Sequence, residues 1–215
     1  MIIEDTGILL HLRLLKESGL IATFFTKEHG KLAGFMRKPN SKFGSDLIPA
    51  NLFMIRWKAR LEEHLGNINA EIIQNNFHKT MTNRSRAAIS YILGMLMRNF
   101  KEKASAAVLY QRVIVVIDRI DTASHLELLQ AIFRFEIALL HDMGFGINMT
   151  ECALTGSDIS EPLHYISPKT GAACTLAAGH AYHDRLFVIP EFFRSNVLRE
   201  SELSEVSRIL AHYLN

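Results

Sequence analysis

A run of basic residues near the amino end of the chain has the composition of a surface that binds phosphate groups. Between residues 27 and 60 there are eight lysines and arginines against two acids, a net charge of +6, whereas residues 80–215 carry 13 basic and 14 acidic residues. Cations that neutralise phosphates release condensed counterions, which favours a polyanion largely without regard to its sequence. A solvated surface rich in lysine would have the same composition, so charge alone leaves both interpretations open. The candidate positions are Lys27, Lys31, Arg37, Lys38, Lys42, Arg56, Lys58 and Arg60.

Aromatic residues are interleaved with these charges, as in proteins that stack nucleic-acid bases on exposed rings. In Arg56-Trp57-Lys58 the period of a strand places both charges on one face and Trp57 on the other. We expect Trp57 to lie in the core, although an exposed indole would stack on a base. We expect Phe35 to be buried in its apolar strand, which leaves Phe43 in the basic segment as the better stacking candidate.

Two cysteines stand where a zinc ribbon would have them. Cys152-Ala153-Leu154-Thr155 and Cys174-Thr175-Leu176-Ala177 have the spacing of two CxxC pairs, but threonine and alanine occupy the second position of each pair. Structural zinc needs four ligands, and no two of His164, His180 and His183 have finger-like spacing to replace the missing ones. The sequence therefore predicts two buried thiols that act as small apolar residues, with no metal and no other cofactor.

His180, His183 and Asp184 are the residues that come nearest to a catalytic group. Two histidines three positions apart and a carboxylate can bind a metal ion, yet hydrolysis also needs a further ligand and a base in convergent positions. The sequence contains no GxSxG, Walker glycine loop or HExxH motif. A metal-dependent hydrolase is therefore the least favoured alternative, and we expect no catalytic residues and no enzyme.

The elements that carry the basic residues have the period of β-strands. Turn signals separate them: Gly30 in Glu28-His29-Gly30 can take the positive φ of a tight hairpin, and prolines punctuate residues 39–49. Five short strands with basic connections predict a small Greek-key barrel of the oligonucleotide-binding (OB) type, and an SH3-like barrel would give the same pattern. The predicted strands span residues 7–14, 20–26, 31–36, 52–58 and 67–73.

Beyond residue 77 the apolar residues recur with the period of helices. Ser124 and Glu127 have the spacing of a capping box, and the helix that they open is expected to end at Gly144. The helical period fails between residues 146 and 190, around the two cysteines. Other candidate N-caps are Asn83, Ser105 and Ser201.

These patterns predict an α+β chain with two domains. Residues 1–77 form a five-stranded OB-fold barrel that binds nucleic acid, and residues 78–215 form an all-helical domain, in which residues 146–190 are a degenerate zinc-ribbon-like insertion. The apolar fraction of 48% with 21% charged residues is typical of a packed globular protein. Neither an export signal nor an apolar membrane span is visible, so we expect a cytoplasmic protein.

Three segments of the sequence resemble the RecO family of bacterial recombination mediators, and the likeness extends along most of the chain. They are "FFTKEHGKLAGFMRKPNSKFGSDLIP" with "WKARLEEHLG" after it, "FRFEIALLHDMGFGINMTECALTG", and "YISPKTGAACTLAAGHAYHDRLF". The second is the most distinctive, and the third is similar to the form of the family that has lost zinc ligands. The resemblance implies an OB fold, a helical C-terminal domain and a remnant metal loop.

The same resemblance implies partners and activities. It implies binding of single- and double-stranded DNA, annealing of complementary strands, and cooperation with RecR and single-stranded DNA-binding protein to load RecA, in the nucleoid and without a membrane. It also implies docking of the acidic tail of single-stranded DNA-binding protein on the helical domain, where ion pairs with Asp118, Asp121 or Glu136 are an equal alternative. The candidate arginines for that tail are Arg112, Arg119 and Arg134.

Two further alternatives concern the DNA path and the class of protein. A second basic group at the ends of the first predicted helix either extends the path of the DNA or is solvated. An interaction adaptor whose barrel does not bind DNA would have much the same sequence. The members of the second basic group are Arg84, Arg86, Arg98, Lys101 and Lys103.

Overall fold

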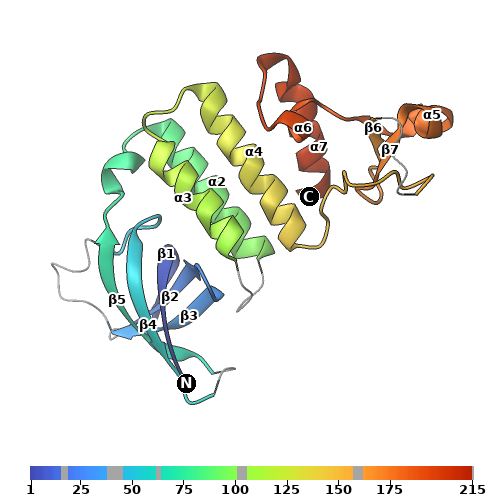
Figure 1. Ribbon diagram of the computed structural model, residues 1–215. Helices are drawn as coiled ribbons and strands as arrows, with labels where there is room; N and C mark the ends of the chain where they lie inside the picture. The colour runs from blue at the N-terminus through green and yellow to red at the C-terminus, as the bar shows by residue number, and fades with distance from the viewer. Residues whose placement is uncertain (16–18, 38–45, 62–63, 101–105, 157–161, 215) are drawn as a thin grey trace. The chain divides into compact units, whose positions relative to one another are not determined.

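The chain divides into two compact units. In this computed structural model they are residues 1–122, the N-terminal unit, and residues 123–215, the C-terminal unit (Figure 1). The structure describes all residues except 16–18, 38–45, 62–63, 101–105, 157–161 and 215.

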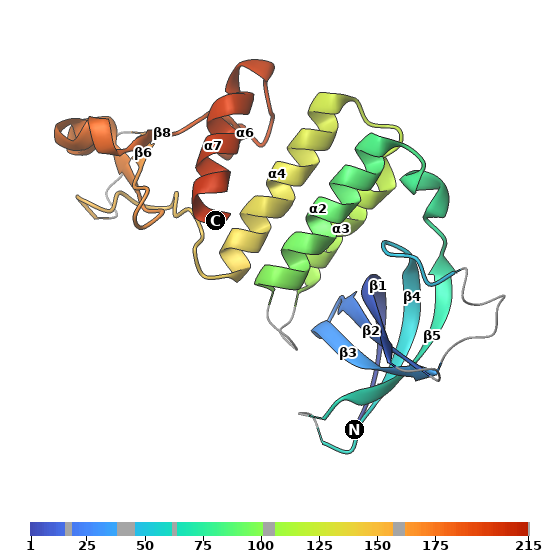
Figure 2. The same ribbon diagram turned by 180° about the vertical axis from the view of Figure 1, so that it is seen from behind.

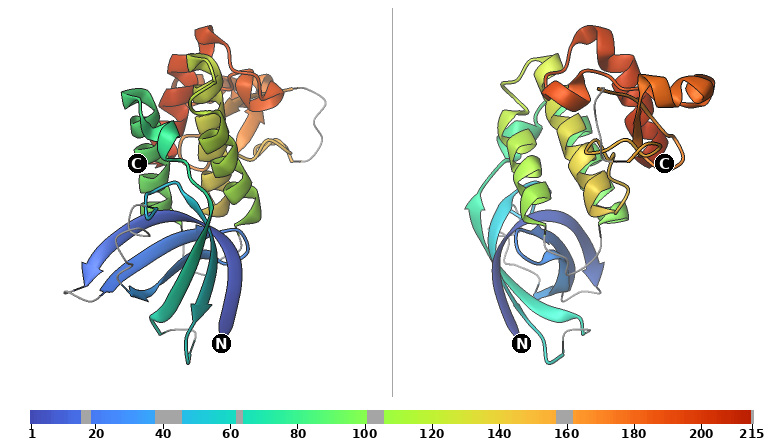
Figure 3. Two further views of the ribbon diagram at one scale, coloured as in Figure 1. Left: turned by 90° about the vertical axis from the view of Figure 1, so that its left-hand side faces the viewer. Right: turned by 45° about the vertical axis from the view of Figure 1, so that its right-hand side comes forward.

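Five strands open the N-terminal unit and curve around a common interior (Figure 3). Each of the five predicted strands lies within an observed one, because a period of two in apolar residues is a strong local signal. Gly30 has φ +62°, which confirms its predicted role in the β2–β3 hairpin. The strands are β1 (Ile2–Leu15), β2 (Gly19–Thr26), β3 (Gly30–Arg37), β4 (Leu52–Lys58) and β5 (Gly66–Gln74).

The strand pairings form a circuit. β1 pairs antiparallel with both β2 and β4, β2 with β3, and β4 with β5. A short parallel contact between β3 and β5 completes the circuit. In this contact Gly34 lies opposite Gly66 and Phe35 lies opposite Asn67.

Two glycines make the contact between β3 and β5 close. A Cβ atom on Gly34 would lie 2.7 Å from Cγ1 of Ile68, and one on Gly66 would lie 2.4 Å from the indole of Trp57. Trp57 is buried, as predicted, and its Nε1–H donates to the carbonyl oxygen of Ala33 at 3.0 Å. The indole therefore fastens β4 to β3 beside the two glycines.

The interior of the strands is filled by the side chains that alternate inward. Phe24 of β2 and Phe53 of β4 meet edge to face with ring centroids 5.5 Å apart, which is a favourable aromatic geometry. Leu9, Leu32 and Trp57 belong to the same buried cluster. The inward set is thus apolar, and charged side chains are left for the outer surface.

Two helices complete the N-terminal unit, α2 (Asn83–Asn99) and α3 (Ala107–Arg119) (Figure 2). Phe25 projects to the outer side of β2, and its ring contacts those of Phe100 and Tyr110 at centroid distances of 5.2 and 6.0 Å. The helices therefore cover the part of the outer β2 surface that surrounds Phe25.

Local contacts fix the start and the orientation of these helices. The N-cap of α2 is Thr82, whose Oγ1 accepts from the backbone N–H of Ser85 at 3.0 Å, so Asn83 is the first helical residue and not the predicted cap. The predicted cap Ser105 lies outside the described residues. Lys79 of the short 3-10 helix η1 (Phe77–Thr80) pairs with Asp118 at 3.1 Å, which ties η1 to α3.

The C-terminal unit begins with α4 (His125–Asp142), and here the predicted capping box is confirmed. Ser124 Oγ accepts from Glu127 N at 3.3 Å, and the carboxylate of Glu127 accepts from Ser124 N at 2.8 Å. Helix α7 (Leu203–Leu214) packs against α4 through a buried apolar cluster. The predicted cap Ser201 is wrong, because it lies inside the 3-10 helix η3 (Glu200–Glu202) and α7 begins two residues later.

Strands interrupt the helices of the C-terminal unit, so this part of the chain is not all-helical as predicted. β6 (Leu163–Ile166) pairs with β7 (Ala173–Thr175) on one side and with β8 (Phe187–Val188) on the other. Three shorter helices accompany them, α5 (Leu176–Gly179), η2 (His180–Arg185) and α6 (Phe192–Ser195). The coarser prediction, an α+β chain with five N-terminal strands and helices in its C-terminal part, is confirmed.

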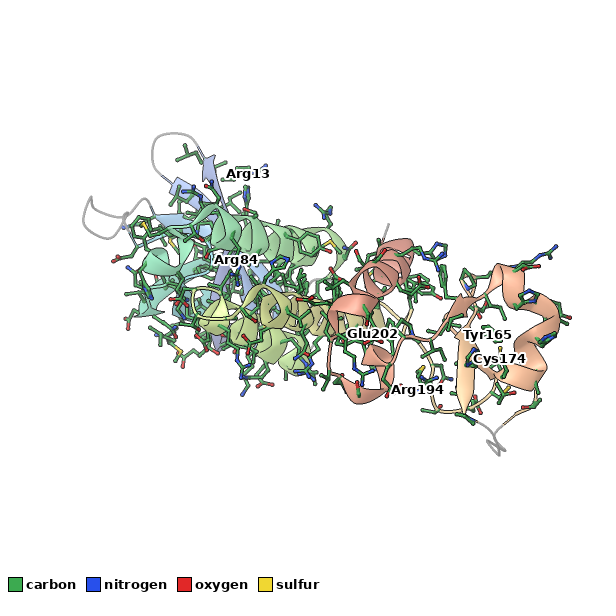
Figure 4. The ribbon with its side chains drawn as sticks, turned by 90° about the horizontal axis from the view of Figure 1, so that it is seen from above. Arg13, Arg84, Tyr165, Cys174, Arg194 and Glu202 are labelled. Atoms are coloured by element: carbon green, nitrogen blue, oxygen red, sulfur yellow. The ribbon has the colours of Figure 1, made fainter. Side chains whose placement is uncertain are left out.

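Polar contacts hold α6 in the C-terminal unit. Arg194 donates to the carbonyl oxygen of Leu163 at the start of β6 and pairs with Glu191 at 3.2 Å (Figure 4). Glu202 accepts from the backbone N–H of Phe192 at 3.1 Å. Within the described ranges, no helix is long and apolar enough to cross a membrane.

We predict that Gly66→Ala destabilises the N-terminal unit. The added methyl group would displace the Trp57 indole, and overpacking of this kind costs about 1–3 kcal/mol in unfolding free energy. Urea denaturation measures the change. Gly94→Ala is the matched control, because a Cβ there meets only an arginine side chain at 3.5 Å and alanine is favoured in a helix by about 1 kcal/mol. Equal stability of the two variants would contradict the close packing of the Trp57 indole on Gly66.

Candidate nucleic-acid interface

Five of the eight predicted phosphate-binding residues are exposed, and two of these five pair with an exposed carboxylate. Arg37 ends β3, Lys58 ends β4 and Arg60 follows it, and all three side chains are exposed. In the part of the chain that the structure describes, none of these three pairs with a carboxylate. Arg56 pairs with Glu4 at 3.2 Å, with both side chains about 60% exposed. An ion pair so exposed is worth about 0–1 kcal/mol, so the Arg56 guanidinium can exchange partners.

The two lysines of the β2–β3 hairpin lie in different environments. Lys27 is exposed and pairs with its neighbour Glu28 at 3.3 Å. Lys31 is partly buried, and its Nζ donates to the carbonyl oxygen of Met97 at 3.0 Å. That carbonyl belongs to the last turn of α2, where backbone oxygens have no helical partner and a cation is favoured. Lys31 therefore fastens α2 to the sheet.

A buried carboxylate shapes the same hairpin. Asp5 of β1 is 8% exposed and accepts hydrogen bonds from the backbone N–H groups of Thr6 and Glu28, at 2.7 and 2.9 Å. His29 Nδ1 lies 2.9 Å from the same carboxylate. The turn that carries Lys27 is thus tied to β1.

Cross-strand neighbours form a continuous row on the outer surface of the strands. Arg13 lies opposite Ile21, Ile21 opposite Phe35, Phe35 opposite Asn67, and Asn67 opposite Lys58. Neighbours directly opposite each other in a sheet project from the same face. We call these five residues the outer row. It contains a cation at each end and no acid.

Phe35 lies on the outer face of β3 and is only partly buried, so the prediction that it is buried is wrong. The side chains of Leu32 and Met36 point into the core, and strand alternation sends Phe35 outward. The predicted stacking candidate Phe43 and the predicted cations Lys38 and Lys42 lie outside the described residues.

Arg13 belongs to the outer row although it precedes the basic run that composition points to. It is exposed on the outer side of β1, as Figure 4 shows. The signal lies in the pairing of neighbouring strands, because Arg13 of β1 lies opposite Ile21 of β2. Counting charges in a sequence window could not reveal this.

The second basic group does not form one patch. Arg84, labelled in Figure 4, and Arg86 lie in the first turn of α2. Arg98 lies in the last turn of α2, about 20 Å away at 1.5 Å per residue. Arg86 donates to the side chain of Asn83, and Arg98 to the sulfur of Met95. The remaining members, Lys101 and Lys103, lie outside the described residues.

The three arginines expected to dock an acidic tail are divided between the two units. Arg112 and Arg119 are exposed on α3, seven residues apart and so on one side of that helix. Asp118, one of their alternative partners, pairs with Lys79. Arg134 is partly buried on α4 and donates to the carbonyl oxygen of Asn196.

The loop at Cys152 is a tight turn closed by its own backbone. Cys152 and Gly156 form an isolated antiparallel bridge, in which the Gly156 N–H donates to the Cys152 carbonyl oxygen at 2.9 Å and Gly156 has φ +86°. Thr155 stands at the position of the missing cysteine, and its hydroxyl hydrogen-bonds the Cys152 thiol. That bond lowers the pKa of Cys152, while burial of the side chain opposes the shift.

The second cysteine is packed and not exposed. Cys174 is 4% exposed, and it lies with Tyr165 over Gly179, where a Cβ would come within 2.8 Å of its sulfur (Figure 4). Burial raises the pKa of Cys174, with a smaller contribution from Cys152. The prediction of two buried thiols is confirmed.

The residues of the hydrolase alternative are engaged with each other. His183 Nδ1 lies 2.9 Å from the carbonyl oxygen of His180, and its Nε2 lies 2.9 Å from Asp184. Both ring nitrogens of His183 thus have protein partners. Over the described residues, no group of three or more His, Cys, Asp or Glu side chains is placed to hold a metal ion.

Comparison with known proteins identifies relatives over the whole chain. Residues 1–76 match the family described as Recombination protein O N terminal, and residues 84–215 match Recombination protein O C terminal. The chain is similar to the DNA repair protein RecO of Sinorhizobium medicae, with 32% identity over 99% of this chain and 85% of that protein. It is also similar to the RecO proteins of Beijerinckia indica, at 34% identity over 98% and 85%, and Rhodopseudomonas palustris, at 35% over 90% and 76%.

We predict that Thr155→Val raises the pKa of the Cys152 thiol. Valine keeps the shape of threonine but removes the donor that favours the thiolate. The absorbance of the thiolate at 240 nm against pH, in a Cys174→Ala background that leaves one thiol, measures the shift. Since the folded-state pKa is the lower one, the hydrogen bond should add stability as the pH rises from about 7 toward 9, and the variant should lose that gain.

Thr150→Val is the control for this titration. The Thr150 hydroxyl donates to the side chain of Asn148 at 2.7 Å in the same segment, on the exposed surface. It should leave the Cys152 titration unchanged. A titration that is also unchanged in Thr155→Val would contradict a hydrogen bond from Thr155 to the Cys152 thiol.

Proposed function

The chain belongs to the RecO family of DNA repair proteins, and from this premise we propose that it is a non-catalytic recombination mediator. Membership gives it a role in DNA repair and recombination. We propose that it binds single- and double-stranded DNA, anneals complementary strands, and with RecR helps to load RecA onto DNA coated by single-stranded DNA-binding protein. Its place of action would be the nucleoid.

The outer row is the observation that supports DNA binding by the N-terminal unit. A cation stands at each end, and Arg37 lies on the same face, opposite Gly19. Cations that are exposed and without carboxylate partners keep their full charge for phosphates. The circuit of five strands, with mixed antiparallel and parallel pairing, supports an OB-type barrel, a class that binds oligonucleotides across its strand 2 and 3 face.

The predicted cations divide into three roles in this proposal. Arg37, Lys58 and Arg60 contact phosphates directly, joined by Arg13. Lys27 and Arg56 reach phosphates by exchanging weak carboxylate partners. Lys31 acts indirectly, by holding α2 on the sheet. Lys38 and Lys42 stay assigned to phosphate contact on the charge of their segment alone.

The acidic tail of single-stranded DNA-binding protein is proposed to meet the arginines of the helices. Arg112 and Arg119 offer two exposed guanidinium groups on one side of α3, which suits carboxylates spaced along a peptide. Arg134 is a weaker candidate, because it is partly buried and bonded to Asn196.

We predict that Arg37→Gln combined with Lys58→Met weakens binding of labelled single-stranded DNA and flattens its salt dependence. Each lost phosphate contact should reduce the log-log slope of affinity against salt by about 0.7. Fluorescence anisotropy at several salt concentrations measures both quantities. We expect this result because each exposed cation that neutralises a phosphate releases a counterion condensed on the DNA.

Lys31→Met is the matched variant for this experiment. This substitution removes one positive charge from β3, the strand that also carries Arg37. The ammonium group that is lost donates to the Met97 carbonyl oxygen in the wild-type protein. The variant should lower the unfolding free energy by about 1 kcal/mol and leave the salt slope near that of wild type. A slope that is unaffected by the double substitution would point to an interaction adaptor that does not bind DNA through these strands. Annealing of strands coated by the cognate single-stranded DNA-binding protein tests the mediator role directly.

A further inference from the structure

We infer that Phe35 is a platform on which an unpaired base stacks, so that the outer row selects single strands over duplex. The inference rests on the proposed function and adds to it the chemical preference of the site. It depends on three features of the described residues: where the ring lies, what covers the sheet around it, and which charges flank it.

The Phe35 ring lies across the surface of β2. A Cβ atom on Gly19 would be 2.1 Å from Cε2 and 2.6 Å from Cζ of the ring, so the ring occupies the space that any other residue at position 19 would fill. Gly19 is the diagonal neighbour of Phe35, since Phe35 lies opposite Ile21. The glycine therefore lets the ring rest on the sheet, where it stays partly exposed.

The outer face of β2 and β3 is divided between a covered part and an open part. Phe25 projects from this face, where Phe100 and Tyr110 lie against it. Phe35 projects from the same face further along the strands, and it is partly exposed. Both rings are apolar, yet only the first is sealed by the helices. The open ring is the one available to a ligand.

The charges around Phe35 favour an anionic chain. Arg13 and Lys58 are each two strands away from Phe35 along the outer row, about 10 Å at the usual strand spacing. Arg37 lies opposite Gly19, beside the ring. A base stacked on Phe35 would thus have cations on both sides for its neighbouring phosphates. Bases in a duplex stack on each other and offer no free face, so this arrangement prefers a single strand.

The test compares Phe35→Leu with wild type on three probes of equal length: a single-stranded oligonucleotide, the same strand with abasic sites, and a duplex. Loss of stacking should weaken single-strand binding about 5- to 150-fold and leave duplex binding nearly unchanged. Wild type should prefer the intact strand to the abasic one, and the variant should bind both alike. Phe77→Leu, at a ring 48% exposed in η1, is the matched control and should have no effect.

Gly19→Ala provides a second variant in which Phe35 itself is kept. Its methyl group would lift the ring from the sheet and should reproduce the loss of single-strand preference, with no further loss when it is added to Phe35→Leu. Thermal melts establish that the variants are folded. Salt-dependent DNA binding that is insensitive to Phe35→Leu, or lowered equally for strand and duplex, would overturn this inference and leave the proposed function intact. Failure of wild type to bind any DNA would overturn both.

Discussion

The close approach of β3 to β5 is the constraint on which the N-terminal unit depends. Gly34 and Gly66 allow two backbones to meet where side chains would collide, and the Trp57 indole covers Gly66 while its N–H bonds the Ala33 carbonyl oxygen. This contact joins β3 to β5, which completes the circuit of strand pairings, and it makes Phe35 and Asn67 neighbours. Without it the outer row would end at Phe35, and Lys58 would no longer be continuous with Arg13. A packing requirement inside the sheet thus sets the charge pattern outside it.

The outer face of β2 and β3 packs against helices in one part and stays exposed in another. Around Phe25, aromatic contacts and the bond from Lys31 to the α2 terminus hold the helices in place. Around Phe35 nothing comparable is found among the described residues, and the nearby cations stay exposed. Lysines that look equivalent in the sequence are therefore not equivalent in the structure. Lys31 donates to a backbone carbonyl oxygen and serves stability, while others, such as Lys58, are exposed to solvent.

The sequence predicts the strands well and the assignment of residues to faces less well. Apolar runs bounded by Gly30 and by prolines locate the strands, and the capping box at Ser124 locates α4, because both signals are local. In β3 the run from Leu32 to Met36 is apolar throughout, so alternation is lost and the outward position of Phe35 cannot be read from it. The bond of Lys31 to Met97 joins residues 66 positions apart, which no local pattern encodes. The short strands β6 to β8 were not predicted for a related reason, because each has too few residues for a period to emerge.

The loop at Cys152 is held by interactions that are individually weaker than metal ligation. In a zinc ribbon, four thiolates held by one ion would fix two such turns, whereas here a threonine hydroxyl donates to the single thiol and backbone N–H groups add to it. One neutral hydrogen bond is worth about 1 kcal/mol, far less than a bound ion, so the loop needs a second source of order. The buried cluster supplies it, since Cys152, Tyr165, Ile166 and Cys174 pack together with the sheet β7-β6-β8. Both cysteine side chains fill space in this cluster, and the hydrogen bonds that the turn directs at the Cys152 sulfur lower the pKa of its thiol.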